Sequence, residues 1–216
     1  MTELLEKLGR LGVVPVVKIE QAEDAIELGR ALLAGGLPCA EITFRTAAAE
    51  EAIQRISSSL PEIIVGAGTV LSVDQAERAV SAGARFIVSP GFNQKVVDWC
   101  LQNEMPVAPG VATPTEIDMA LDKGLEILKF FPAEALGGIR MLKAIAAPYG
   151  GVKFIPTGGI NQDNLGDYLA QPSVHCCGGS WLVKANLISA GRFDEITQLT
   201  RDAISMVRRV RGSMEA

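Results

Sequence analysis

Short runs of β-branched and other apolar residues alternate along the chain with longer stretches whose apolar residues recur at helical spacing. The short runs predict eight strands, at residues 13–18, 39–43, 63–67, 86–89, 105–108, 126–130, 152–157 and 174–177. The longer stretches predict helices at 22–34, 47–58, 73–82, 94–103, 114–122, 139–146, 162–170 and 193–210, with a short segment from residue 181 before the last one. A strand–helix unit repeated in this way is typical of parallel strands joined by helical crossovers.

Eight such units favour an α/β fold of the closed (β/α)₈ type, a TIM barrel, over an open doubly wound sheet. The 216 residues are close to the lower limit of roughly 200 for that fold, so we expect one domain, residues 1–216, with short loops. The stretch 2–8 before the first strand predicts a helix that plugs the N-terminal end of the barrel. Because the active site of such a barrel lies at the C-terminal ends of the strands, polar residues there are candidates for chemistry.

Charge and composition exclude several classes of partner. The chain has 20 Lys and Arg against 25 Asp and Glu, a net charge of −5 with no basic stripe, so we expect neither nucleic acid nor a membrane as partner. The apolar runs are far shorter than the roughly 20 residues of a membrane span. No hydrophobic signal region follows residues 1–10, which predicts a cytoplasmic protein. The four cysteines have no repeated spacing and are interpreted as reduced core thiols: Cys39, Cys100, Cys176 and Cys177.

The sixth predicted strand places Lys129 near its C-terminal end among apolar neighbours. Alternation along a strand puts Ile127, Lys129 and Phe131 on one face. If that face is the barrel interior, partial desolvation leaves a useful fraction of the lysine as free amine, which can attack a ketone. The alternative is a lysine that extends to the surface along its apolar stem. Lys18, at the end of the first strand, is an equally placed rival.

The second strand puts Glu41, Thr43 and Arg45 on one face. A carboxylate, a hydroxyl and a guanidinium make a poor core but a good site, in which Glu41 could transfer protons and Arg45 could bind a substrate carboxylate. The alternative is an internal ion pair between Glu41 and Arg45, or a solvated edge.

Glycine turns follow two neighbouring strands, Gly158 and Gly159 after the seventh, and Gly178, Gly179 and Ser180 after the eighth. Glycine lets backbone N–H groups approach an anion closely, and phosphate sites of these barrels commonly use those two loops. A similar turn after the third strand, residues 66–69, ends at Thr69, whose hydroxyl could reach a substrate carboxylate.

His175 is the only histidine of the sequence. With Cys176 and Cys177 it forms three consecutive residues, which cannot all face one metal from a strand, so we expect no metal site. No Ser/His/Asp triad is expected either, because His175 lies inside a strand and not in a loop above it.

Several strings together resemble the KDPG/KHG aldolases, the class I aldolases of 2-keto-3-deoxy-6-phosphogluconate and 4-hydroxy-2-oxoglutarate. The strings are Val-Val-Pro-Val-Val (13–17), Glu-Ile-Thr-Phe-Arg-Thr (41–46), Val-Gly-Ala-Gly-Thr-Val (65–70), Ser-Pro-Gly-Phe (89–92), Leu-Lys-Phe-Phe-Pro-Ala-Glu (128–134), Pro-Thr-Gly-Gly-Ile (156–160) and Gly-Gly-Ser-Trp (178–181). The resemblance covers residues 5–210 and implies a trimeric (β/α)₈ barrel that binds a small phosphorylated keto acid without a metal or other cofactor.

The resemblance also implies roles for individual residues. It selects Lys129 over Lys18 as the Schiff-base lysine and gives proton transfer to Glu41. It places Arg45 and Thr69 at the substrate carboxylate. The phosphate side and the pocket wall would be formed by Gly158, Gly159, Gly179, Ser180, Pro90, Phe131 and Thr157. Lys18 and the string 175–177 lie outside the family signature.

Two alternatives stay open from the sequence. One is an aldolase for the epimer 6-phospho-2-dehydro-3-deoxygalactonate, which differs at one hydroxyl. The other is a barrel without catalytic activity that binds a sugar phosphate. Such a protein would keep the glycine turns but would have no reason to place Lys129 opposite Glu41.

Overall fold

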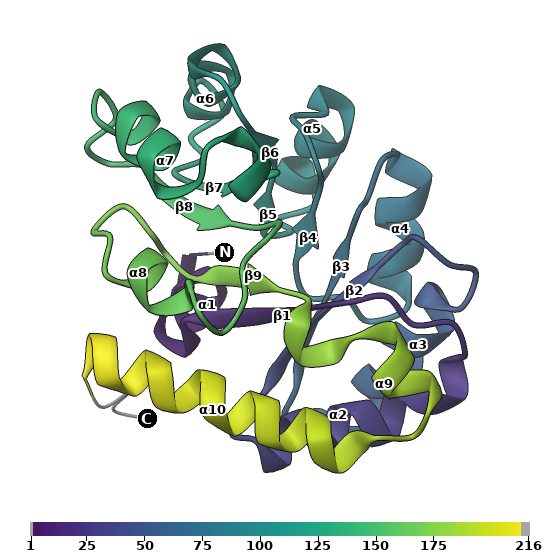
Figure 1. Cartoon of the computed structure of the whole chain (residues 1–216). Helices are drawn as coiled ribbons and strands as arrows, with labels where there is room; N and C mark the ends of the chain where they lie inside the picture. The colour runs from purple at the N-terminus through teal and green to yellow at the C-terminus, as the bar shows by residue number, and fades with distance from the viewer. Residues whose placement is uncertain (1, 213–216) are drawn as a thin grey trace.

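The computed structural model describes residues 2–212, in which parallel strands alternate with helices that lie around the outside of the strands (Figure 1). The strands are β1 (Val13–Val17), β2 (Cys39–Thr43), β3 (Ile64–Gly68), β4 (Ile87–Val88), β5 (Val107–Ala108), β6 (Gly110–Val111), β7 (Ile127–Phe130), β8 (Lys153–Pro156) and β9 (Cys177–Gly179). The α-helices are α1 (Thr2–Leu11), α2 (Ala25–Ala34), α3 (Ala49–Ser59), α4 (Val73–Ser81), α5 (Gln94–Gln102), α6 (Pro114–Leu121), α7 (Gly138–Ala146), α8 (Leu165–Leu169), α9 (Ala185–Ser189) and α10 (Phe193–Arg211). Three short 3₁₀ helices complete the set: η1 (Ala22–Asp24), η2 (Glu134–Leu136) and η3 (Trp181–Val183).

The strands form two parallel sheets. The first has six strands in the order β5-β4-β3-β2-β1-β9, and the second has three in the order β6-β7-β8. The sheets meet at two places. β5 and β6 are consecutive in the chain with Pro109 between them, and isolated parallel bridges pair Phe154 with Val174 and Thr157 with Gly178. The predicted α/β class with parallel strands and helical crossovers is therefore confirmed.

The predicted elements agree with the structure in order, although many of their ends differ by one or more residues, and three of the differences bear on the site. The fifth predicted strand, 105–108, is represented by β5 and continues beyond Pro109 as β6. The helix predicted at 162–170 is shorter, Leu165–Leu169. The eighth strand, predicted at 174–177, is β9 at Cys177–Gly179, so Gly178 and Gly179 lie inside a strand and not in a turn after it. In that strand Gly178 pairs with Val14 and Gly179 with Pro15.

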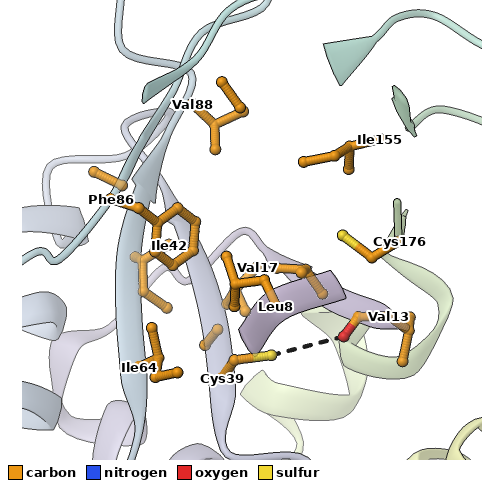
Figure 2. Close-up of a cluster of buried hydrophobic side chains, with 14 of the residues drawn as sticks. Leu8, Val13, Val17, Cys39, Ile42, Ile64, Phe86, Val88, Ile155 and Cys176 are labelled. Carbon is orange, nitrogen blue, oxygen red and sulfur yellow. Dashed lines mark hydrogen bonds between the residues drawn. The ribbon is translucent and has the colours of Figure 1, made fainter. Parts of the chain in front are cut away.

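Apolar side chains fill the interior at the N-terminal ends of the strands (Figure 2). Val13, Cys39 and Ile64 are the first residues of β1, β2 and β3, and Leu8 of α1 lies among the same group. Leu8 is almost fully buried, at 1% exposure. The thiol of Cys39 donates to the carbonyl oxygen of Val13 over 3.6 Å. The amphipathic helix before β1 therefore contributes to the core at this end of the strands.

Polar contacts close the same end of the molecule. The Nε2 atom of His175 lies 2.7 Å from the carbonyl oxygen of Leu5 in α1. Arg211, the last residue of α10, donates to the carbonyl oxygens of Val174 and His175 at 2.7 Å each and to that of Gly9 at 3.1 Å. These contacts join α1, α10 and the segment before β9. His175 thus belongs to this end of the strands, and the described residues contain no cluster of three or more potential metal ligands.

No helix within residues 2–212 is long and apolar enough to cross a membrane. All four cysteines are free and buried. Burial raises the pKa of Cys100 to about 12, and that of Cys176 also to about 12. At neutral pH these thiols keep their protons and behave as small apolar core residues.

Candidate active site

Lys129 of β7 and Glu41 of β2 face each other in the interior. The Nζ atom of Lys129 lies 3.5 Å from Oε1 of Glu41, and the two side chains are 6% and 5% exposed. Among the described residues they are the only charged side chains in the buried set. The Oε1 atom of Glu41 has no hydrogen-bond partner, which is costly for a buried carboxylate oxygen. A buried amine and carboxylate with an unsatisfied oxygen contribute little to stability, which makes the pair a candidate for chemistry.

The strands make room for this pair with small residues. Glu41 pairs with Gly66 of β3 and Thr43 pairs with Gly68. A Cβ atom on Gly68 would lie 2.0 Å from Oε1 of Glu41, so only glycine leaves space for the carboxylate. On the other side, Lys129 lies between Gly110 of β6 and Ile155 of β8. The predicted inward orientation of both charged residues is what the structure has.

A cavity of about 390 Å³ lies at the C-terminal ends of β1, β2, β8 and β9, and neither Lys129 nor Glu41 is among its lining residues. Thr43 and Phe131 do line it, and they lie two residues beyond Glu41 and Lys129 in the chain, so on the same faces. The Nζ atom of Lys129 is 5.2 Å from the centre of the Phe131 ring, a cation–π contact that orients the amine. The cavity brings together six of the residues that the sequence suggested for substrate binding: Arg45, Phe131, Thr157, Gly158, Gly159 and Ser180.

The turn after β8 supplies backbone donors to the cavity. Gly158 and Gly159 have φ angles of 97° and 85°, which disfavour any residue with a side chain. The carbonyl oxygen of Gly158 accepts from the N–H of Glu134 at 3.0 Å, and that of Gly159 accepts from the Asn164 amide at 3.1 Å. Within residues 2–212 no acceptor pairs with the N–H groups of Gly159 and Ile160. Free N–H groups on glycine-turn residues that line a cavity, with the turn carbonyls paired elsewhere, are typical of an anion site.

Strand β9 contributes to the same cavity in a different way from the predicted glycine turn. Gly178 lines the cavity, and a Cβ atom there would lie 2.3 Å from Oγ1 of Thr157. A Cβ atom on Gly179 would lie 1.9 Å from the Trp181 ring. These glycines therefore permit close packing between β8, β9 and η3, and the exposed Ser180 that follows brings a hydroxyl to the cavity.

Three of the suggested substrate residues do not line the cavity: Gly179, described above, Pro90 and Thr69. Pro90 lines a separate depression of about 390 Å³, together with Leu71 and Phe92. Thr69 lines neither this depression nor the cavity, although it directly follows Gly68. Its φ of 56° is unusual for a residue with a branched side chain, and strained backbone of this kind concentrates at functional sites.

Lys18 and Lys184 also line the cavity. Lys18 is a rim residue, because its side chain is 41% exposed and its Nζ atom lies 2.5 Å from Oε1 of Glu20. This exposed ion pair separates it from the buried Lys129. Lys184, which sequence reasoning missed, precedes α9 and is exposed. The sequence could have indicated Lys184, because it is a basic residue four positions after Ser180, which was already suggested for phosphate binding.

The fold and the site together define a parallel α/β protein with a buried amine–carboxylate pair and a cavity at the C-terminal ends of its strands. A family model described as KDPG and KHG aldolase matches residues 4–199. A 2-dehydro-3-deoxy-phosphogluconate aldolase of Treponema pallidum (strain Nichols) is 50% identical over 207 residues, 96% of this chain and 99% of that protein.

Two solved structures are similar over nearly the whole chain. A KDPG aldolase from Legionella pneumophila, with pyruvate captured as a covalent carbinolamine intermediate, has a TM-score of 0.89 and 41% identity, and the match covers 92% of this chain and 97% of that one. The 2-keto-3-deoxy-6-phosphogluconate aldolase of Zymomonas mobilis with 3-phosphoglycerate has a TM-score of 0.87 and 40% identity, with coverage of 94% and 95%. The chain belongs to the KDPG and KHG aldolase family, as the sequence strings indicated.

Proposed function

We propose that this protein is a metal-independent class I aldolase that cleaves 2-keto-3-deoxy-6-phosphogluconate to pyruvate and glyceraldehyde 3-phosphate. The observation that carries this proposal is the buried Lys129 with its amine 3.5 Å from a Glu41 oxygen that lacks any other partner. The pyruvate carbinolamine of the Legionella pneumophila relative supports the same chemistry.

The reaction follows from the residue types. The Lys129 amine adds to the C2 ketone to give a carbinolamine, which loses water to form an iminium ion. Glu41, directly or through a water molecule, accepts the proton of the C4 hydroxyl. The C3–C4 bond then breaks, its electron pair moves into the iminium to form an enamine, and glyceraldehyde 3-phosphate leaves. Proton return to C3 and hydrolysis of the new iminium release pyruvate and restore the lysine.

The cavity accounts for the two ends of the substrate. Ser180 and the free N–H groups of Gly159 and Ile160 suit the C6 phosphate. Arg45 suits the C1 carboxylate, with Thr69 beyond Gly68 as a second contact. The 3-phosphoglycerate of the Zymomonas mobilis relative is a phosphorylated acid of similar chemistry. Phe131 and Thr157 form the wall between the two anionic ends.

We further propose cleavage of 4-hydroxy-2-oxoglutarate to pyruvate and glyoxylate. The imine and proton-transfer steps use only Lys129 and Glu41 and require no phosphate, and the matched family model includes this activity in its name. Comparing the gluconate and galactonate substrates at equal concentration tests the epimer alternative, because a higher rate for the galactonate would favour it.

Borohydride trapping tests the central proposal. Sodium borohydride with pyruvate should inactivate the protein and add one reduced pyruvate to the peptide that contains Lys129. Labelling at Lys18 would move the nucleophile to the rim, and the absence of any label would favour a binding protein without catalysis. Incubation with EDTA should leave the activity unchanged, because the iminium ion serves as the electron sink.

We also propose that residues 1–216 form one closed eight-stranded barrel. In support, β5 and β6 are separated by Pro109 alone and would count as one strand, and the bridges at Val174 and Gly178 join β8 to the β9 segment. Leu8, buried among the interior side chains, supports a plug formed by α1. Removal of residues 1–11 should therefore lower the melting temperature, and it deletes none of the residues that line the cavity.

A homotrimer in the cytoplasm completes the proposal. Leu71 is 55% exposed and borders the depression that contains Pro90 and Phe92, an apolar surface that suits contact with another copy. Free thiols in all four cysteines suit a reducing compartment. Light scattering during size-exclusion chromatography tests the assembly, and Leu71→Asp should dissociate it.

A further inference from the structure

A buried phenol contacts the base of the phosphate turn. Tyr168 of α8 has no exposed surface, and its hydroxyl donates a hydrogen bond to Oε1 of Glu134. Glu134 begins η2, the short helix after β7. Burial, followed by the hydrogen bond to Glu134, raises the pKa of Tyr168, so the phenol stays a donor at neutral pH. Neither residue takes part in the reaction proposed above.

The carboxylate of Glu134 has little freedom. Gly138 has a φ of 62°, and a Cβ atom there would lie 2.9 Å from Oε1 of Glu134 and 3.3 Å from the Tyr168 hydroxyl. The start of α7 thus closes over the hydrogen bond. Although Glu134 is exposed overall, one of its oxygens is fixed on the protein side of the turn.

Glu134 in turn supports the glycine turn through both backbone and side chain. Its N–H donates to the carbonyl oxygen of Gly158 at 3.0 Å, and the neighbouring Ala133 N–H donates to Thr157 at 2.8 Å. A Cβ atom on Gly159 would lie 2.5 Å from both Cβ and Cγ of Glu134. The turn therefore rests on the stem of this side chain, and a movement of the stem would move the N–H groups of Gly159 and Ile160.

We propose that Tyr168 and Glu134 are positioning residues that hold the Gly158–Gly159 turn in the geometry that binds the substrate phosphate. The hydrogen bond also keeps the Glu134 carboxylate away from an anion site, where a free negative charge would repel phosphate. This inference rests on the proposed function, because it needs a substrate with a phosphate at this turn.

The test compares substrates with and without phosphate. Tyr168→Phe should lower kcat/KM for 2-keto-3-deoxy-6-phosphogluconate about tenfold, mainly through KM, the size expected for losing one hydrogen bond to a charged group. The value for 4-hydroxy-2-oxoglutarate should stay within about twofold. Inorganic phosphate, assayed as an inhibitor of 4-hydroxy-2-oxoglutarate cleavage, should bind more weakly to the variant.

Tyr149→Phe is the matched control, since the Tyr149 hydroxyl also donates to a carboxylate, that of Asp118 at 2.9 Å, but outside the cavity. This variant should leave kcat/KM unchanged for both substrates. Glu134→Gln keeps an oxygen that can accept from Tyr168 and should retain the wild-type substrate ratio, whereas Glu134→Ala should reproduce the phosphate-specific loss. This second pair tests the inference if Tyr168→Phe does not fold.

Equal losses on both substrates, or an unchanged ratio in Tyr168→Phe and Glu134→Ala, would overturn the positioning role. Failure of the proposed function looks different. In that case the wild-type protein itself would cleave neither substrate and would form no imine with pyruvate.

Discussion

The two ends of the strands differ in how their polar groups are paired. At the N-terminal ends, His175 contacts the carbonyl of Leu5, and Arg211 donates to three carbonyl oxygens in two neighbouring segments. At the C-terminal ends, an oxygen of Glu41 has no hydrogen-bond partner, and the N–H groups of Gly159 and Ile160 have no acceptor among the described residues. One end thus gains stability from its polar groups, while the other keeps them available for a ligand.

Lys129→Arg should produce the largest effect, because the guanidinium stays charged and cannot form an imine. We expect activity at the background rate and no borohydride label with pyruvate. Lys153→Arg is the control at the opposite end, where Nζ of Lys153 donates to Pro172 at 2.8 Å on the surface. Full activity of Lys129→Arg would show that another amine carries the reaction.

Glu41→Gln should slow cleavage by about 10²-fold, the usual range for loss of a general acid or base, while imine formation with pyruvate persists. Single-turnover trapping separates the two steps from each other. Near-normal turnover would transfer the proton step to another group, such as water held by Thr43 or Thr157.

Ser180→Ala should weaken cleavage of the phosphorylated substrate by about 1–3 kcal/mol, the cost of a hydrogen bond to a charged group. It should barely affect 4-hydroxy-2-oxoglutarate. Ser57→Ala serves as the control for both substrates. The Ser57 hydroxyl donates to the carbonyl oxygen of Ala82 over 2.9 Å, and neither residue lines the cavity. If Ser180→Ala reduced both activities equally, the serine would contact the pyruvate half that they share.

Arg211→Ala should have the smallest effect on catalysis and act on stability alone. Loss of the carbonyl contacts should lower the free energy of unfolding by about 1–2 kcal/mol, since an exposed arginine gains only part of the strength of each hydrogen bond. Denaturant unfolding measures this change, with Arg209→Ala as the comparison. A reduced kcat/KM in folded Arg211→Ala would show that the two ends are not independent.

Local pattern was sufficient to group the residues in the central part of the site. The strand Cys39–Thr43 has the predicted bounds, and period-two alternation grouped Glu41 with Thr43 and Lys129 with Phe131 but left open which face points inward. The choice of Lys129 over Lys18 needed the family resemblance. The two lysines differ physically in burial. Lys18 is exposed at the rim, where it pairs with Glu20, whereas the side chain of Lys129 is buried.

Contacts between distant segments account for what the sequence pattern missed. Gly178 and Gly179 resemble a turn locally, but they pair with β1 as strand residues. They are glycines because Thr157 and Trp181 occupy the space where their Cβ atoms would be. The position of Lys184 depends on how η3 and α9 return to the cavity. The hydrophobic periodicity of a segment does not predict which distant segments it will contact.

Gly68 has a practical consequence for selection and library design. The three atoms nearest to a methyl group at this position all belong to the Glu41 side chain, with Oε1 at 2.0 Å, so the chain could fold by displacing that carboxylate. Gly68→Ala would then be an allele with normal expression and a normal melting temperature but little activity. A screen that measures protein abundance would retain Gly68→Ala, whereas a growth selection that depends on the enzyme's activity would remove it. Residue 68 is therefore best kept as glycine in a mutant library.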